Sequence, residues 1–232
     1  MPSRVLVVSS DPQGSAVWWA ERVGEKLPFD YLLCHQSPIE LTNLLKKLLA
    51  AGAEVHVIVN QKGGAGKTTV TVNLAATVAD AVGEAAMEGQ YDHVFVDTAG
   101  NIEDDKFAED KLLLAALDHC TDAVVPMPPE ALAFDPTLRT VKRILIPKQT
   151  KYKVIVNDWD PRDGDVELKE TINWLDKQGF TRANTVIRHY KLHTRASLEG
   201  KVCTMYAHNR IALEAKGDFS KAALELGYGG KR

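Results

Sequence analysis

A glycine-rich run between two lysines carries the clearest chemistry in this chain. Residues 57–69 read Val-Ile-Val-Asn-Gln-Lys-Gly-Gly-Ala-Gly-Lys-Thr-Thr. The β-branched start favours a strand, and apolar residues recur at helical spacing afterwards, so the glycines lie between a strand and a helix N-terminus. There, backbone N–H groups and the helix dipole bind phosphate oxygens, Lys67 can reach the terminal phosphates, and the Thr68 hydroxyl can ligate Mg²⁺. The predicted phosphate-binding residues are Gly63, Gly64, Ala65, Gly66, Lys67, Thr68 and Thr69.

This run departs from the common phosphate-loop motif at one position. The motif begins with glycine, whereas this chain has Gln61, followed by Lys62 before the paired glycines. The result is the deviant form Lys-Gly-Gly-x-Gly-Lys-Thr-Thr. A glycine turn without a ligand is the alternative interpretation. The preceding strand, the following helix and the two lysines together argue against it.

Two aspartates follow other buried strands. Asp11 ends the apolar run that begins at Val5, and Asp97 ends a second apolar run that begins at Val94. Either carboxylate could only cap a turn. Beside a phosphate loop, however, a carboxylate at a strand end is the expected outer ligand of magnesium or the group that positions the attacking water.

Elsewhere the chain alternates between strand and helix patterns, which predicts an α/β fold with a mostly parallel sheet and helices on both faces. Ligands of such sheets collect at the carboxyl ends of the strands. We expect strands at 4–9, 31–35, 55–60, 93–97, 123–126, 153–157 and 185–188. We expect helices at 16–26, 39–50, 68–82, 136–145, 166–178 and 211–226.

Composition limits the classes of protein that fit. With 232 residues, 45% of them hydrophobic, and no linker-like stretch, the chain predicts a single domain over residues 1–232. Its three cysteines are far apart, which argues against a disulfide framework or a thiolate metal site. We find no signal segment and no apolar run long enough to span a bilayer, so we expect a cytoplasmic protein. A net charge of −3 requires any nucleic-acid contact to be local.

Four segments spread over nearly the whole chain carry a resemblance to a known family. They are Asn60-Gln61-Lys62-Gly63-Gly64-Ala65-Gly66-Lys67-Thr68-Thr69, Asp11-Pro12-Gln13-Gly14-Ser15-Ala16, Val96-Asp97-Thr98-Ala99 and Asn184-Thr185-Val186-Ile187-Arg188. With these segments the chain resembles the ParA family of partition ATPases, of the small plasmid-partition type. The family belongs to the deviant-Walker group of P-loop NTPases, which also includes the division-site protein MinD. The resemblance implies a slow, Mg²⁺-dependent ATPase that binds ATP and ADP and dimerises around two ATP molecules.

The resemblance also assigns roles to residues. It implies that Lys62 crosses to the partner subunit's phosphates, that Asp11 orients the attacking water, and that Asp97 holds magnesium through water. Asn157 resembles the family's adenine-contacting position, and Pro128 would flank the base. Signal-recognition GTPases share the Asp-Thr-Ala-Gly turn, but their Thr-Lys-x-Asp guanine motif is replaced here by a strand ending in Asn157-Asp158, so adenine is preferred. Ser9 stands where the family usually has a second aspartate.

The order of the segments differs from that of the family. There the phosphate loop comes first, whereas here residues 1–50 carry the Asp-Pro-Gln-Gly unit, residues 55–82 the phosphate loop, and residues 91–232 the remainder. The connectors at 48–54 and 83–90 are rich in Ala, Gly and Glu, as in designed linkers. Exchanging two strand–helix units leaves the strand positions and the carboxyl-end loops unchanged. An engineered rearrangement is our interpretation, and a natural relative with this order is the alternative.

A basic cluster near the C-terminus suggests a partner. It comprises Arg188, Lys191, Arg195 and Lys201, opposed in the sequence only by Glu199. A solvated face is the plain interpretation. The resemblance favours non-specific binding of duplex DNA, which would fall with salt and would associate the protein with the nucleoid. It also implies a centromere-binding adaptor of the ParB or ribbon-helix-helix type.

Two other functions compete with a DNA-segregation switch. A MinD-like positioning ATPase would need a terminal membrane helix, but Ile211, Ala215 and Phe219 belong to an apolar stripe better docked on the core. An engineered variant that binds nucleotide without hydrolysing it is the other.

In the pair Trp18-Trp19, adjacent helical positions face different directions, so one ring lies in the core and the other at an interface, unless packing accounts for both.

Overall fold

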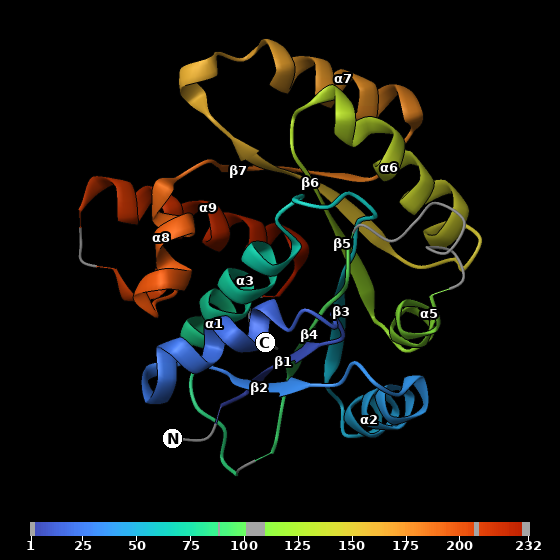
Figure 1. Cartoon of the computed structure of the whole chain (residues 1–232), viewed down its shortest axis with the longest axis vertical. Coiled ribbons are helices and arrows are strands. Elements are labelled where there is room, and N and C mark those ends of the chain that lie inside the picture. The colour runs from blue at the N-terminus through green and yellow to red at the C-terminus, as the bar shows by residue number, and fades with distance from the viewer. Residues whose placement is uncertain (1–2, 88, 101–109, 207–208, 229–232) are drawn as a thin grey trace.

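Seven parallel strands form one sheet in this computed structural model, which describes residues 3–87, 89–100, 110–206 and 209–228 (Figure 1). Along the sheet the order is β2-β1-β4-β3-β5-β6-β7. All seven predicted strands are confirmed, with ends that move by a few residues. Their bounds are β1 Val5–Ser9, β2 Asp30–Leu33, β3 Glu54–Ile58, β4 His93–Asp97, β5 Asp122–Met127, β6 Tyr152–Trp159 and β7 Arg182–Arg188.

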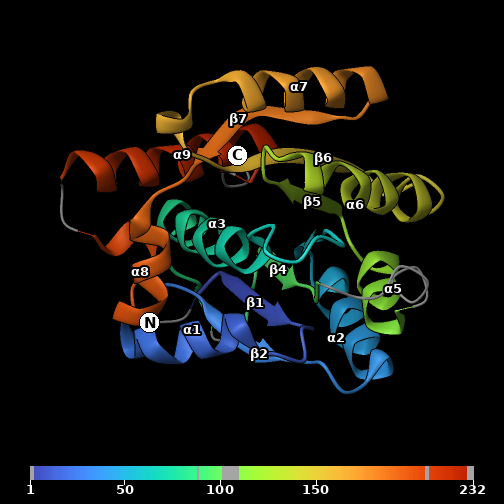
Figure 2. The same ribbon diagram turned by 45° about the horizontal axis from the view of Figure 1, so that its top comes forward.

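Helices cover both faces of the sheet, as the alternation of patterns predicted (Figures 1 and 2). In β1, Val5 and Val7 pack toward one set of helices, and Leu6 and Val8 pack toward the other. The first set is α1 Ser15–Val23, α3 Lys67–Val82, α8 Lys191–Glu199 and α9 Arg210–Leu226. The second set is α2 Pro38–Ala50, α5 Lys111–Asp118, α6 Phe134–Arg139 and α7 Val166–Gln178.

Local sequence explains several helix ends. The Ser37 side chain accepts a hydrogen bond from the Glu40 N–H, and Pro38 occupies the first turn of α2. Helix α9 ends at Gly227, whose φ of 90° few other residues adopt. The helix expected from residue 136 begins earlier, at Phe134, and continues beyond α6 as a π-helical segment at 140–145.

Two expectations about packing have mixed outcomes. Trp19 lies in the core, whereas the side chain of Trp18 is 43% exposed, so one ring of the pair is core and the other is not. The α9 stripe docks through Ala215 and Phe219, but Ile211 is 56% exposed, whereas the next residue, Ala212, is buried. None of the helices in the described ranges is long and apolar enough to cross a membrane.

The two Ala/Gly/Glu-rich connectors lie at the amino ends of strands. Residues 51–53 join α2 to β3, and residues 83–92 join α3 to β4. Strand β4 lies between β1 and β3, with Val8 and Val57 both in register with Val96. The segment order of this chain therefore brings the carboxyl ends of β1, β4 and β3 to one edge of the sheet.

Candidate functional site

The phosphate loop, Asp11 and the turn after β4 surround one cavity at the carboxyl edge. The register pairs Ser9 of β1 and Ile58 of β3 with Asp97, so the loops that follow all three strands start side by side. The cavity measures about 190 Å³. Its lining comprises Asp11, Gln13, Ser15, Gly63, Gly64, Gly66, Lys67, Thr68, Thr69, Thr98 and Gly100.

A larger cavity of about 610 Å³ continues from the first and shares Gly64, Gly66 and Thr68 with it. Asn157, Trp18 and residues of the β7–α8 region line its far side. A cavity pair of this kind can hold phosphates in the small part and a base in the large part. Pro128, expected to flank the base, lines neither cavity.

Two glycines give the loop its shape. Gly64 and Gly66 have φ of 74° and 82°, a region that residues with a Cβ rarely adopt. A Cβ on Gly66 would lie 2.3 Å from the Asn157 amide nitrogen. That amide donates a hydrogen bond to the Ala65 carbonyl at 3.0 Å. Asn157 therefore supports the loop as well as lining the larger cavity.

Lys67 extends under the loop, where its side chain is buried. Its Nζ donates to the Lys62 carbonyl at 3.2 Å. Burial lowers the pKa of Lys67, while the nearby carboxylates Asp97 and Asp11 oppose this shift. A desolvated ammonium inside a ring of backbone N–H groups gains most from an anion, and a phosphate supplies one.

Asp97 at the end of β4 and Thr68 at the start of α3 offer only oxygen atoms as possible metal ligands. The Thr68 hydroxyl donates to the Asp97 carboxylate at 2.9 Å, and the Thr71 hydroxyl does so at 3.3 Å. Burial raises the pKa of Asp97 to about 7, although these hydroxyls oppose the shift. A divalent cation would stabilise the charged carboxylate, and Mg²⁺ prefers oxygen ligands, so the residues present fit magnesium.

The position of Asp11 is compatible both with a turn cap and with a role in the phosphate site. Its carboxylate accepts the Gln13 N–H at 2.9 Å, which is the geometry of a turn cap, and it also lines the smaller cavity. Gln13 and Ser15, which line both cavities, were not predicted as site residues; their place in the turn after Asp11 was the available signal. The buried Ser9 hydroxyl has no hydrogen-bond partner among the described residues.

Lys62, expected to act on a partner subunit, makes an ion pair within its own chain. Its Nζ lies 3.3 Å from the Glu130 carboxylate, and that carboxylate is half exposed. Sequence reasoning missed Glu130, because nothing in the pattern places residue 130 beside the phosphate loop. The ion pair holds Lys62 at the rim of the loop.

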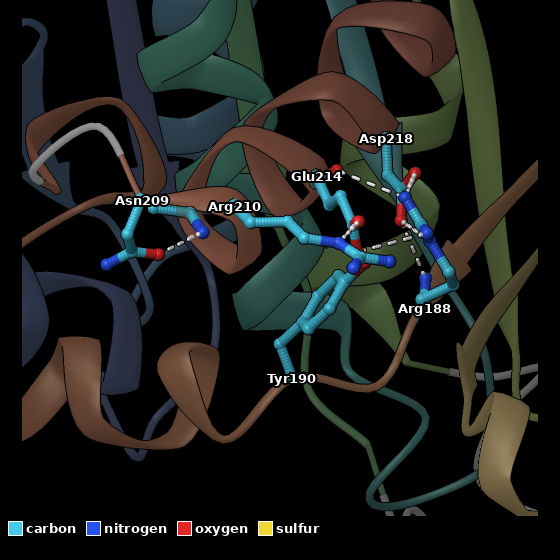
Figure 3. Close-up of polar contacts among 7 residues, drawn as sticks. Arg188, Tyr190, Asn209, Arg210, Glu214 and Asp218 are labelled. Atoms are coloured by element: carbon cyan, nitrogen blue, oxygen red, sulfur yellow. Dashed lines mark hydrogen bonds and ion pairs between the residues drawn. The ribbon is translucent and has the colours of Figure 1, made fainter.

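The expected basic cluster is partly neutralised, and the expectation that only Glu199 opposes it is wrong. Arg188 donates from Nε and Nη2 to the two Asp218 oxygens, both at 2.8 Å, and Glu214 lies 3.5 Å from its Nη1 (Figure 3). Lys201 pairs with Glu199 at 3.1 Å. Of the four predicted DNA-binding residues, the structure leaves Lys191 and Arg195 exposed on α8.

Comparisons with known proteins match most of the chain. Residues 56–201 match the family model described as the CobQ/CobB/MinD/ParA nucleotide binding domain. The maintenance of carboxysome distribution protein A of Gloeobacter kilaueensis is 30% identical over 224 residues, covering 96% of this chain and 80% of that protein.

Solved structures support the fold alone, because their identities are low. The cell division protein MinD of Aquifex aeolicus superposes with a TM-score of 0.57 at 18% identity, over 74% of this chain and 97% of that one. Apo McdA of Cyanothece gives a TM-score of 0.55 at 12% identity, over 97% and 88%. A Cyanothece McdA–ATP complex gives 0.53 at 10% identity, over 99% and 87%.

Proposed function

Since this chain belongs to the CobQ/CobB/MinD/ParA nucleotide-binding family, we propose that it is a Mg²⁺-dependent ATPase that dimerises on ATP and positions a cargo on DNA. The observation that carries the proposal is the convergence of Asp11, Lys67 and Thr68 on one cavity. These residues come from two segments of the chain, the turn after β1 and the phosphate loop, and the order of the segments does not disturb their meeting.

Each residue then has a distinct task. The N–H groups of residues 63–69 bind phosphate oxygens, and the Lys67 ammonium neutralises the terminal phosphates. Asp11 orients the attacking water and accepts its proton, while Asn157 keeps the loop in shape and borders the base. Magnesium, held by Thr68 and by Asp97 through water, would withdraw charge from the phosphates during transfer. In the ATP dimer, Lys62 would leave Glu130 and reach the partner's phosphates.

Binding and turnover are tested separately. Mg-ATP or Mg-ADP at a hundred times its dissociation constant adds about 2.7 kcal/mol, which raises the melting temperature of a domain of this size by roughly 5–11 °C. Lys67→Ala should lose this shift, and an unchanged shift would contradict the site. Asp11→Ala should keep the shift and lose ATP turnover; turnover at the parental rate would make Asp11 a turn cap only.

The cargo has two candidates. The motif resemblance favours plasmid DNA, held through a centromere-binding adaptor of the ParB or ribbon-helix-helix type. The 30% identity to a carboxysome distribution protein favours a protein organelle and an adaptor of another kind. Adaptor-stimulated ATP turnover, measured with purified adaptors of each type, distinguishes them.

We propose that non-specific DNA binding depends on Lys191 and Arg195, because Arg188 and Lys201 of the predicted cluster form ion pairs within the chain. Two copies of this exposed pair in an ATP dimer would add their phosphate contacts. Lys191→Glu with Arg195→Glu should abolish gel-shift binding in ATP and leave nucleotide affinity unchanged. Binding by this variant equal to that of the parent would make the pair an ordinary solvated face.

We also propose that residues 1–232 act as a single domain with engineered segment order. Measured ATP turnover tests the alternative of a rewired variant that only binds nucleotide. Liposome sedimentation with nucleotide tests the membrane-associated, MinD-like alternative, against which stands the burial of Ala215, Phe219 and Ala222 in the core.

A further inference from the structure

Two adjacent buried histidines lie at the amino edge of the sheet, opposite the nucleotide cavities. His56 belongs to β3 and His93 to β4, and their side chains are almost fully buried. The His56 Nε2 lies 3.1 Å from the His93 Nδ1. Buried imidazoles require polar partners, and two together in a sheet core call for a specific explanation.

The neighbours of His56 fix which of its nitrogens carries a proton. Its Nδ1 lies 3.1 Å from the Asp122 carboxylate, which also accepts the Tyr228 hydroxyl at 2.7 Å. Burial, with the charge of Asp122, raises the pKa of Tyr228 well above its ordinary value. The phenol therefore stays protonated and donates a hydrogen bond to Asp122. An ionised carboxylate only accepts hydrogen bonds, so the His56 Nδ1 donates and its Nε2 offers a lone pair toward His93.

Glu54 completes a group of three ligand atoms. Its carboxylate lies 3.8 Å from the His93 Nδ1, and the ligand atoms of Glu54, His56 and His93 are all within 4.8 Å of one another. Ligands about 2.0–2.1 Å from a tetrahedral zinc ion lie about 3.3–3.4 Å apart. The observed separations bracket this value, and the Glu54 side chain, 39% exposed, is able to rotate inward.

We propose that Glu54, His56 and His93 bind one zinc ion, with water as the fourth ligand. Two imidazoles and one carboxylate suit zinc and related transition metals rather than Mg²⁺ or Ca²⁺, which prefer oxygen alone. Asp122 acts as the outer partner of His56, because metal-bound histidines usually donate their other N–H to a carboxylate. The metal would replace the proton through which the His93 Nδ1 now donates a hydrogen bond to the His56 Nε2.

The position of the site indicates a structural role. Glu54 follows the connector at 51–53, and His93 follows the connector at 83–92, so both ligand-bearing strand starts lie directly after the two connectors. A bound ion would hold the beginnings of β3 and β4 together at the edge farthest from the nucleotide. Zinc should therefore raise the melting temperature without nucleotide.

Tag-free, nucleotide-free protein is titrated with ZnCl₂ by calorimetry, and with CoCl₂ for the intense visible absorption of tetrahedral cobalt. We expect one ion per chain. Glu54→Gln, at a half-exposed position, should keep the fold and weaken zinc binding on the order of tenfold or more. Asp122→Asn should weaken it about 10–100-fold. His35→Asn, which changes a histidine at the opposite edge, is the matched control and should bind zinc as the parent does.

Two results would overturn the proposal. One is the absence of zinc binding to folded parental protein. The other is equal zinc affinity in the parent, in Glu54→Gln and in His93→Asn, which would place the ion elsewhere. Circular dichroism confirms that each variant is folded, and if His93→Asn unfolds, Glu54→Gln alone decides.

Discussion

Replacing Arg188 with alanine tests whether this residue belongs to the fold or to a DNA surface. The guanidinium makes two 2.8 Å hydrogen bonds to Asp218, whose side chain is 6% exposed. Loss of the guanidinium would leave this carboxylate buried, with the Arg188 backbone N–H, 3.2 Å away, as its remaining hydrogen bond from residue 188. We expect Arg188→Ala to destabilise the protein.

The magnitude follows from the burial of the pair. Breaking a fully buried ion pair costs about 3–5 kcal/mol, and an exposed pair is worth about 0–1 kcal/mol. Arg188 is 27% exposed and Asp218 nearly buried, so we expect a loss of about 2–3 kcal/mol. For a domain of this size that lowers the melting temperature by roughly 4–12 °C.

Urea unfolding followed by circular dichroism measures the effect, with Arg195→Ala as the exposed arginine control. The control should change stability by about 0.5 kcal/mol or less. A double-mutant cycle with Asp218→Ala isolates the energy of the pair, since the double variant has no unpaired carboxylate. Equal stability of Arg188→Ala and Arg195→Ala, together with lost DNA binding in Arg188→Ala alone, would refute this reasoning.

Three further predictions concern Gly66, His193 and Glu130. Gly66→Ala should abolish nucleotide binding, measured with a fluorescent ATP analogue, because its Cβ would meet the Asn157 amide at 2.3 Å; normal affinity would contradict the loop geometry. Burial lowers the pKa of His193 to about 4, so the folded protein binds fewer protons than the unfolded chain and its stability falls as pH drops from about 6.5 to 4. At pH 5 this protonation lowers the free energy of unfolding by about 2 kcal/mol relative to neutral pH. In His193→Leu this pH-dependent loss should be absent when urea unfolding at pH 5 is compared with that at pH 7; an unchanged pH dependence would contradict the assignment. Glu130→Gln frees Lys62 from an ion pair worth less than about 1 kcal/mol, so ATP-dependent dimerisation in the ultracentrifuge should rise by about fivefold at most; a fall would show that Glu130 itself supports the dimer.

Strands and the phosphate loop were predictable because their signals are local. The run around Gly63–Thr69 and the apolar strands ending in Asp11 and Asp97 carry their structure in adjacent residues. Helix α5 was missed although Asp110 caps its first turn, accepting the N–H groups of Leu112 and Leu113. It was missed because the residues before it gave no pattern; those at 101–109 lie outside the described ranges.

Contacts distant in sequence were not predictable in the same way. Arg188 meets Asp218 thirty residues later only because α9 packs beside β7. Charge counted along the sequence therefore overstated the basic surface. Glu130 beside Lys62 depends likewise on how β5 follows β3 in the sheet.

The pairing of β1 with β4 separates two capacities of this protein. The phosphate loop and its helix are contiguous in the chain, whereas Asp11 is brought to the site by the pairing that aligns β1 with β4. An opening confined to the β2–β1 edge would withdraw the Asp11 carboxylate, which we propose orients the attacking water, and would leave the phosphate loop intact. The affinity for ATP and the rate of its hydrolysis would then depend on different local unfolding events. Hydrogen exchange at β1 would report only the event that affects hydrolysis.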